Sequence, residues 1–341
     1  MTDRPAAPYL FDARSAGWPR NTGWERYARE IARRMETSDP QVRVRVSGSS
    51  HMMSRVWQDF VATPVAIRSA RVAHFPTLPP VPWAPARAAL VYTLHDLTWW
   101  RWRETASRMG RHYYAYFARA AALGRAHIVT GTEAIAAEVV DHFGLDRSGV
   151  TVVPLGVELP APLDQTARPR PYLLTVATLE PRKNLNRLSE AYQRSGLAAT
   201  HDLLVVGRMA WGERPPGVEV VSNLNDYELA TVYAGASALV LPSLYEGFGL
   251  PAVEAMQLGV PVICSDIPVL REVTGGRALY IDATNTDVLV DALRTAPYAV
   301  APLGAASWAA ETYQWKHTVE ALSTLYRRLD AAGTTRARGS A

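Results

Sequence analysis

Short apolar runs alternate with helix-like patterns along the whole chain. Runs rich in Val, Ile, Leu and aromatic residues predict strands, and apolar residues three or four positions apart predict helices. In the first half, the expected strands are 9–11, 42–46, 72–75, 90–94, 127–129 and 150–153, and the expected helices are 24–35, 107–123 and 133–142. In the second half, the expected strands are 172–176, 203–206, 218–221, 238–241, 260–263 and 279–281, and the expected helices are 184–194, 226–234, 250–258 and 286–294. This alternation predicts parallel sheets built from βαβ units.

A proline-rich stretch separates the two halves. Residues 160–171 hold four prolines among polar residues without periodicity, as is typical of a linker. We therefore expect an α/β fold with two doubly wound, Rossmann-like domains facing a central cleft. The domains are expected at 1–163 and 164–315. At 316–341 we expect a C-terminal helix, for which a return to the first domain is one option, and a frayed tail.

Composition places the chain among globular proteins. It has 48% hydrophobic and 20% charged residues. Its apolar runs fall short of the roughly 20 residues that a membrane-spanning helix needs, and the first residues lack a signal-peptide pattern. We therefore expect a cytoplasmic protein. The one cysteine, Cys264, allows no internal disulfide and is expected to be inert core.

Positive charge is concentrated in the first half. Residues 1–165 hold 20 Arg and 15 acidic residues, whereas 166–341 hold 16 basic and 17 acidic residues. Such an excess suits an anionic acceptor or a peripheral contact with the inner face of a membrane, but a solvated basic face explains it equally well. The stretch 99–104, WWRWRE, mixes cations and aromatics, and is either an interfacial surface or a segment packed through its aromatics. Nothing indicates a nucleic-acid partner, and the oligomeric state is left open.

The stretch 242–256, PSLYEGFGLPAVEAM, combines two carboxylates with a strand-to-helix turn. It follows an apolar strand and leads into a helix that has proline in its first turn. Such a helix start offers N–H groups and partial positive charge to a phosphate at the carboxyl end of a parallel strand. Glu246 in the loop and Glu254 in the helix are then placed to bind hydroxyls on opposite sides of that phosphate. A sugar nucleotide is the simplest ligand of this kind.

A second loop, 179–185 or LEPRKNL, places two cations just before an expected helix. Cations at a helix start oppose the macrodipole by roughly 0.3–1 kcal/mol each, and an anion between them reverses that penalty. We interpret Arg182 and Lys183 as clamps on a diphosphate that also neutralise the departing leaving group. The alternative is a solvated pair in a loop.

Two further loops follow expected strands of the first half. Gly23 begins a helix and lets a ligand approach the backbone closely, although a plain capped helix explains this pattern as well. His95 and Asp96 end a strand where the cleft is expected, whereas a lone histidine is more often structural. The scattered histidines give no metal-ligand spacing, so we expect no metal. The P-loop and G-x-G-x-x-G patterns are missing, which weakens the P-loop NTPase and nicotinamide interpretations.

Taken together, these motifs resemble the retaining glycosyltransferases of family 4, which have the two-domain GT-B fold. The resemblance rests on PRKN at 181–184, VGR at 206–208 and PSxxEGFGLPxxEA at 242–255, and less tightly on GxxRY at 23–27, TxHDL at 93–97 and VPxGV at 153–157. It covers nearly the whole chain. Two positions depart from the family pattern: Ala177 replaces a common glycine, and Trp24 replaces a smaller residue.

The resemblance implies a role for each matching residue. Glu246 and the backbone of Gly247, Phe248 and Gly249, at the helix start with Leu250, would bind the transferred sugar. Arg182 and Lys183 would bind the diphosphate, and Glu254 the ribose. The remaining implied binding residues are His95 and Asp96 near the donor sugar, Gly23 near the diphosphate, and Arg208 and Asn223 near the nucleotide.

The function that we expect is transfer of a hexose, with mannose from GDP-mannose favoured, to a glycan, glycolipid or small-molecule acceptor. The nucleotide sugar is a co-substrate, so we expect no cofactor. We expect retention of configuration by same-face attack, with positioning and electrostatics as the main source of catalysis. Two alternatives stay open: a sugar-nucleotide epimerase, which needs no acceptor, and a non-catalytic carbohydrate-binding relative, which does not need the phosphate clamp.

Overall fold

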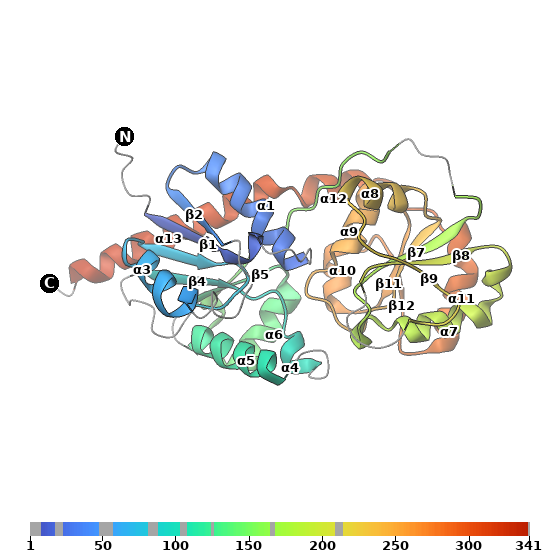
Figure 1. The fold of residues 1–341 in the computed structure, drawn as a ribbon, viewed down its shortest axis with the longest axis horizontal. Helices are drawn as coiled ribbons and strands as arrows, with labels where there is room; N and C mark the ends of the chain where they lie inside the picture. The colour runs from blue at the N-terminus through green and yellow to red at the C-terminus, as the bar shows by residue number, and fades with distance from the viewer. Residues whose placement is uncertain are drawn as a thin grey trace. The chain divides into compact units, whose positions relative to one another are not determined.

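The computed structural model describes residues 8–17, 23–47, 57–80, 88–102, 108–123, 126–163, 168–208 and 214–339. The chain divides into two units, Met1–Gly156 with Trp315–Ala341, and Val157–Gln314 (Figure 1). The division therefore falls before the expected boundary at residue 163, and the C-terminal helix belongs to the first unit. Residues 164–167 of the expected linker lie outside the described ranges.

The first unit is built on a parallel sheet of six strands among the residues described, in the order β2-β1-β3-β4-β5-β6. The strands are β1 (Tyr9–Ala13), β2 (Val42–Val46), β3 (Val72–Phe75), β4 (Ala89–Thr93), β5 (His127–Thr130) and β6 (Val150–Val152). The helical elements are η1 (Arg14–Gly17), α1 (Gly23–Ser38), η2 (Gln58–Ala62), α3 (Thr63–Arg68), α4 (Thr98–Arg101), α5 (Arg108–Leu123), α6 (Glu133–Phe143), η4 (Arg147–Gly149) and α13 (Trp315–Gly339). In the register, Tyr9 is opposite Val42 on one side and Val72 on the other.

The ends of α6 show why its sequence forms a helix. The Thr132 side chain accepts a hydrogen bond from the Ile135 N–H at the start, and Gly144 takes the left-handed conformation at the end, with φ 65°. Hydroxyl caps and C-terminal glycines satisfy backbone groups that a helix leaves unpaired. The segment 57–68, which is helical in the structure, was not predicted as helical.

The C-terminal helix α13 completes the core of the first unit. Fully buried His74 on β3 bonds the Tyr326 hydroxyl through Nδ1 and the Thr93 hydroxyl through Nε2, the latter at 2.7 Å. A Cβ added to Gly156 would lie 2.5 Å from the Trp315 backbone, so this glycine allows a close approach. The helix continues to Gly339, which includes most of the tail that we expected to fray.

Buried His74 makes the stability of the fold depend on pH. Burial, with a smaller contribution from nearby His95, lowers the His74 pKa to about 3 from its usual value of 6.5. Between these values only the unfolded chain binds the proton, so the free energy of unfolding falls as the pH falls below 6.5. From pH 7.0 to 5.5 we expect His74 to account for a loss on the order of 1 kcal/mol. Urea unfolding of the wild type and a His74→Asn variant at both pH values checks this, and an equal loss in both proteins would contradict it.

The second unit also contains a parallel sheet of six strands in its described part, in the order β12-β11-β10-β7-β8-β9. The strands are β7 (Tyr172–Val176), β8 (Asp202–Val206), β9 (Glu219–Val221), β10 (Ala238–Leu241), β11 (Val262–Ser265) and β12 (Leu279–Ile281). The helical elements are η5 (Pro181–Lys183), α7 (Leu185–Ser195), η6 (Leu197–Ala199), α8 (Asp226–Ala234), α9 (Leu250–Gln257), α10 (Pro268–Thr274), α11 (Thr286–Thr295), η7 (Ala296–Tyr298) and α12 (Ala305–Thr312). β11 therefore begins two residues later than expected, after Pro261, which has no N–H to give to a sheet.

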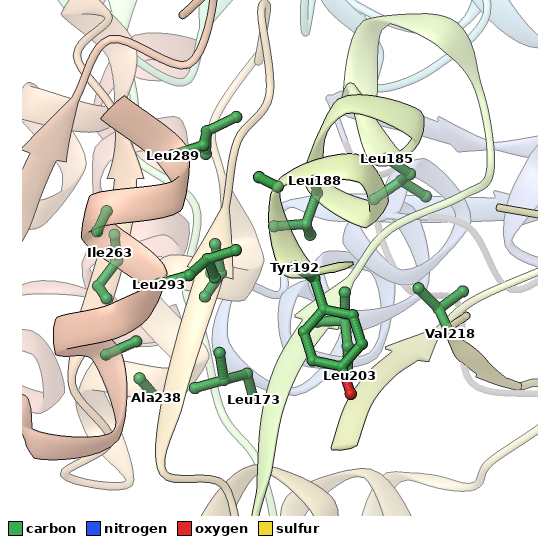
Figure 2. Close-up of a cluster of buried hydrophobic side chains, with 14 of the residues drawn as sticks. Leu173, Leu185, Leu188, Tyr192, Leu203, Val218, Ala238, Ile263, Leu289 and Leu293 are labelled. Atoms are coloured by element: carbon green, nitrogen blue, oxygen red, sulfur yellow. The ribbon is translucent and has the colours of Figure 1, made fainter. Parts of the chain in front are cut away.

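Helices α7 and α11 cover one face of the second sheet. Leu188 and Tyr192 of α7 pack with Leu293 of α11 over Leu173 and Leu203 (Figure 2). The opposite face is covered by α9, which contacts β10 and β11. Because side chains alternate along a strand, apolar residues at successive positions of β10 serve both faces. Cys264 on β11 is fully buried in the core of the second unit. Burial raises the pKa of its thiol to about 12.

Candidate functional site

The strand order of the second sheet creates a topological switch point beside β7. β7 lies between β8 and β10. The chain continues from β7 to β8 and β9 on one side of it, and then crosses to β10 on the other side. The strands pair in parallel, so their carboxyl ends meet at one edge. Doubly wound folds bind ligands at this point, outside the carboxyl ends of the strands. The loops concerned are 177–184 after β7 and 242–249 after β10.

Four charged side chains from these two loops form a compact group, here called the charge cluster. Lys183 Nζ donates to Glu246 Oε1 at 2.6 Å. Arg182 lies between two carboxylates, 2.7 Å from Glu180 Oε1 and 3.6 Å from Glu246 Oε2. Each of the four side chains is at most 14% exposed. The structure thus brings together the three charged residues predicted in these loops, Arg182, Lys183 and Glu246. It adds Glu180, which was not predicted from the sequence.

Backbone contacts hold the two loops against each other. The Leu244 N–H donates to the Arg182 carbonyl at 2.8 Å, and the Arg182 guanidinium donates to the Tyr245 carbonyl at 3.0 Å. Asn184 adopts a left-handed conformation, with φ 59°, between η5 and α7. Its side-chain amide donates to the carbonyls of Pro242 and Ala283. These bonds fix the cluster before any ligand arrives.

Burial and neighbouring charges set the protonation of the cluster. Burial by itself raises the Glu246 pKa, but Lys183 and Arg182 outweigh it, and the pKa lies below its usual value. Burial and the charge of Arg182 lower the pKa of Lys183. Glu246 is therefore a carboxylate at neutral pH, held by cations that are well placed to bind a second anion.

The EGFG turn ends at the start of α9. Gly249 has φ 87°, and an added Cβ would lie 2.7 Å from a methyl group of Leu270, so the turn requires glycine there. The Phe248 side chain is buried and packs edge-to-face on Tyr313, with ring centroids 5.6 Å apart. The Phe248 side chain is therefore directed into the core, and beyond Glu246 the turn presents the backbone of Gly247, Phe248 and Gly249 ahead of Leu250.

Glu254 lies deeper, on α9. Its Oε2 accepts a hydrogen bond of 2.7 Å from the Tyr233 hydroxyl of α8, and both residues are buried. Glu254 was predicted from the sequence but Tyr233 was not, because nothing in the spacing of α8 distinguishes this tyrosine from an ordinary core residue. The two glutamates of the motif thus have different partners, and only Glu246 belongs to the charge cluster.

The loops after β8 and β9 lie at the same edge of the sheet. Arg208 is exposed, and its carbonyl accepts from the Leu179 N–H at 3.0 Å. Asn223 is also exposed and has φ 63°. Asn225, two residues further along, caps α8 in a capping box with Glu228.

In the first unit, the predicted residues gather around His95 at the end of β4. The Pro76 carbonyl can only accept, so His95 Nε2 donates to it at 2.8 Å. Tyr27 contacts the imidazole edge-on at 4.8 Å, and Trp24 stacks on it at 5.9 Å with an interplanar angle of 15°. Burial lowers the His95 pKa, so the ring is neutral at pH 7. Gly23 begins α1 and is exposed.

The segment after His95 packs on α6 and also stays partly exposed. Asp96 Oδ1 accepts from the Thr98 N–H at 2.9 Å at the start of α4. Trp99 and Trp100 both contact His142 of α6, while Trp100 is 37% exposed and α4 has no buried residue, so both interpretations of this stretch stay open. Residues 103 and 104 of this stretch lie outside the described ranges. So do Asn21 and Thr22, whose residue types suit the cap of α1.

Within the described ranges, no group of three or more His, Cys, Asp or Glu side chains is arranged to hold a metal ion. None of the helices that were described has the length and apolar character needed to cross a bilayer.

Two Rossmann-like units, each with a parallel sheet of six described strands, define an α/β protein of the GT-B class. Two family models match consecutive parts of the chain: Glycosyltransferase Family 4 at residues 21–160 and Glycosyl transferases group 1 at residues 164–296. The chain belongs to this glycosyltransferase family. The charge cluster and both glutamates of the motif lie within the second match.

Curated relatives place the chain near mannosyltransferases. It is 37% identical over 131 residues to the O-antigen chain mannosyltransferase B of Escherichia coli, covering 35% of this chain and 34% of the relative. It is 30% identical over 194 residues to the MMP alpha-(1->4)-mannosyltransferase of Mycolicibacterium hassiacum, covering 52% of this chain and 45% of the relative. The matches thus span less than half of each relative's length.

Solved structures share the fold across almost the whole chain. Sucrose-phosphate synthase from Thermosynechococcus elongatus aligns with a TM-score of 0.69 and 18% identity, covering 95% of this chain and 99% of that one. Anabaena HepE, solved with UDP and glucose, aligns with a TM-score of 0.67 and 15% identity, covering 94% and 99%.

Proposed function

We propose that the protein is a retaining hexosyltransferase that moves mannose from a nucleotide diphosphate sugar to a hydroxyl of a glycan, glycolipid or small-molecule acceptor. The observation that carries this proposal is the buried charge cluster at the switch point of a glycosyltransferase fold. Two cations from one loop and a carboxylate from the next are fixed where such folds bind nucleotides.

On this proposal, Arg182 and Lys183 bind the diphosphate and Glu246 binds hydroxyls of the transferred sugar. Lys183 holds Glu246 in the structure, and with the donor bound it would share its charge between this carboxylate and a phosphate. The same cations would stabilise the negative charge that develops as the nucleoside diphosphate leaves. Glu254 is assigned to the ribose and Arg208 and Asn223 to the nucleotide, and His95 is assigned to the donor sugar as the family resemblance implies.

Same-face attack is the mechanism that we favour. A double displacement needs a carboxylate that is free to form a covalent bond with the sugar. In the described part of the second unit, the carboxylates of the cluster are engaged in ion pairs, Glu246 with Lys183 and Glu180 with Arg182. We infer that the leaving phosphate oxygen accepts the acceptor proton, and that the protein contributes positioning and charge stabilisation.

Mannose is favoured as the transferred sugar because both curated relatives described above are named as mannosyltransferases. GDP-mannose is the donor that we propose, since it is the mannose donor expected from the family resemblance. Exposed Arg208 and Asn223 supply polar groups near the proposed nucleotide site, but most of the base contacts would come from backbone atoms.

A thermal-shift screen of GDP-, UDP-, dTDP- and ADP-sugars tests the donor. A ligand at 100 times its dissociation constant stabilises the folded state by about 2.7 kcal/mol. We expect GDP-mannose to give the largest shift, and NMR of the transfer product to show the same anomeric configuration as the donor. Incubation with donor alone serves as the control, because an epimerase would alter the sugar without an acceptor. Stabilisation by none of the four donor classes would contradict the proposal.

The Tyr233–Glu254 hydrogen bond gives a more specific prediction. If Tyr233 orients Glu254 toward the ribose, Tyr233→Phe should weaken GDP binding roughly three- to tenfold, the value of one hydrogen bond. Binding of 2′,3′-dideoxy-GDP should change little, because it lacks the hydroxyls that Glu254 would bind. Calorimetric titration measures both. Tyr192→Phe is the matched control, since its hydroxyl donates to the His201 carbonyl at 2.7 Å outside the site. Equal weakening for both nucleotides would contradict this role.

A further inference from the structure

The segment formed by η2 and α3 in the first unit has its apolar side chains on the outside. Trp57, Phe60, Val61 and Val65 are 55%, 60%, 47% and 55% exposed. The buried residues of the same segment are Asp59, Thr63 and Ile67, of which two are polar. An ordinary surface helix has the reverse arrangement, with its apolar stripe toward the core. We call Trp57, Phe60, Val61 and Val65 the outer apolar face.

Buried polar contacts fix this orientation. Asp59 accepts from Arg14 at 2.5 Å, and Arg14 also pairs with Asp12 at 3.1 Å. Arg45 of β2 bonds the Thr63 hydroxyl at 2.8 Å and also pairs with Asp12. Turning the segment over would break the buried Arg14–Asp59 ion pair, which costs about 3–5 kcal/mol when one partner is lost, and also the Arg45–Thr63 hydrogen bond. The outer apolar face is therefore held outward by the fold.

The described charges that flank the outer apolar face along the chain are mostly positive. Residues 42–71 contain five arginines and one acidic residue, the buried Asp59. Arg45 pairs with Asp12 and Arg71 with Asp330, whereas Arg43 and Arg68 are exposed. Arg43 lies against the end of α3, where it donates to the Ala66 carbonyl and the Ser69 hydroxyl. The face thus combines Trp, Phe and Val with a cationic rim.

We propose that the outer apolar face docks on an anionic lipid bilayer. Aromatic and aliphatic side chains flanked by arginine suit the boundary between acyl chains and negative headgroups. A second copy of this chain fits the face less well, because a symmetric contact sets the patch against itself and brings the exposed arginines of both copies together. The proposed surface is separate from Trp99 and Trp100, which pack on α6. It does not rest on the proposed transferase activity.

Vesicle co-sedimentation tests the docking. We expect binding to vesicles of phosphatidylethanolamine, phosphatidylglycerol and cardiolipin, and at least about tenfold weaker binding to pure phosphatidylcholine. Phe60→Asp combined with Val65→Asp should reduce binding to the anionic vesicles by at least about tenfold. The matched control is Val300→Asp combined with Leu303→Asp, which places the same charges at exposed apolar positions of the second unit. This control should bind like the wild type.

Three results would overturn the proposal: no binding of the wild type to anionic vesicles, equal binding by both double variants, or a dimer of the wild type in sedimentation velocity that only Phe60→Asp with Val65→Asp dissociates. The last result would assign the face to a second copy. Circular dichroism melting of each variant checks that it is folded. The thermal shift with nucleotide sugars should be unchanged in both double variants, so failure of the membrane proposal and failure of the donor proposal give different results.

Discussion

Replacement of Lys183 by methionine is expected to lower turnover at saturating donor by at least about tenfold, or about 1.4 kcal/mol of activation free energy. The ammonium group of Lys183 is buried and lies 2.6 Å from Glu246. In the proposed reaction it also meets the charge that develops on the leaving diphosphate, in surroundings where water screens little. Steady-state kinetics with the identified donor measures the effect.

The same variant should be less stable, because it leaves Glu246 with one cation, Arg182, at 3.6 Å. Loss of one partner from a buried ion pair costs about 3–5 kcal/mol. Adding Glu246→Gln to Lys183→Met should recover part of this loss without recovering turnover. The chain has one other lysine, the exposed Lys316, and Lys316→Met is the control that should leave both quantities unchanged. Normal turnover of folded Lys183→Met would refute the diphosphate clamp.

Gly207→Ala is expected to damage the second unit most among single-methyl additions. A Cβ at this position would lie 1.8 Å from the Ala177 carbonyl oxygen and 2.7 Å from its carbon. Both are backbone atoms, so no side-chain rotation relieves the clash. The carboxyl ends of β7 and β8 are joined here by hydrogen bonds from the Ala177 N–H to Val206 and from the Leu179 N–H to Arg208. Overpacking of this kind costs roughly 1–3 kcal/mol or more.

The clash should also reach the site, since the charge cluster begins at Glu180 directly after these bonds. We expect Gly207→Ala to lower the free energy of unfolding by about 2–3 kcal/mol and to weaken donor binding. Gly149→Ala is the control, because an added Cβ there has no atom within 4 Å. Urea unfolding followed by far-UV circular dichroism compares the two, and equal stabilities would contradict the steric argument.

Much of the fold could be predicted because βαβ repetition leaves a strong local pattern. Buried parallel strands are nearly continuous apolar runs, so strands such as β7 and β10 were predicted at the bounds that the structure has. Polar loops that follow such runs must lie at the carboxyl edge of the sheet. For this reason Arg182, Lys183 and Glu246 were predicted to belong to one site. The glycosyltransferase family was identified from the same loops.

What the sequence did not reveal depends on contacts between distant residues. Glu180 and Tyr233 are unremarkable by spacing, and their roles arise only where their partners, Arg182 and Glu254, approach them in the fold. The outer apolar face was missed for a different reason. Periodicity assigns apolar residues to the core, and this rule fails where buried ion pairs, here Arg14 with Asp59, take the inner positions.

The central claim is that Lys183 and Arg182 form a diphosphate site, and calorimetric comparison of a nucleoside diphosphate with its monophosphate tests it most directly. With GDP and GMP, the account predicts that the wild type binds the diphosphate at least about tenfold more tightly, or 1.4 kcal/mol. The preference should disappear in Lys183→Met. An equal preference in both proteins, or none in the wild type, would contradict the account.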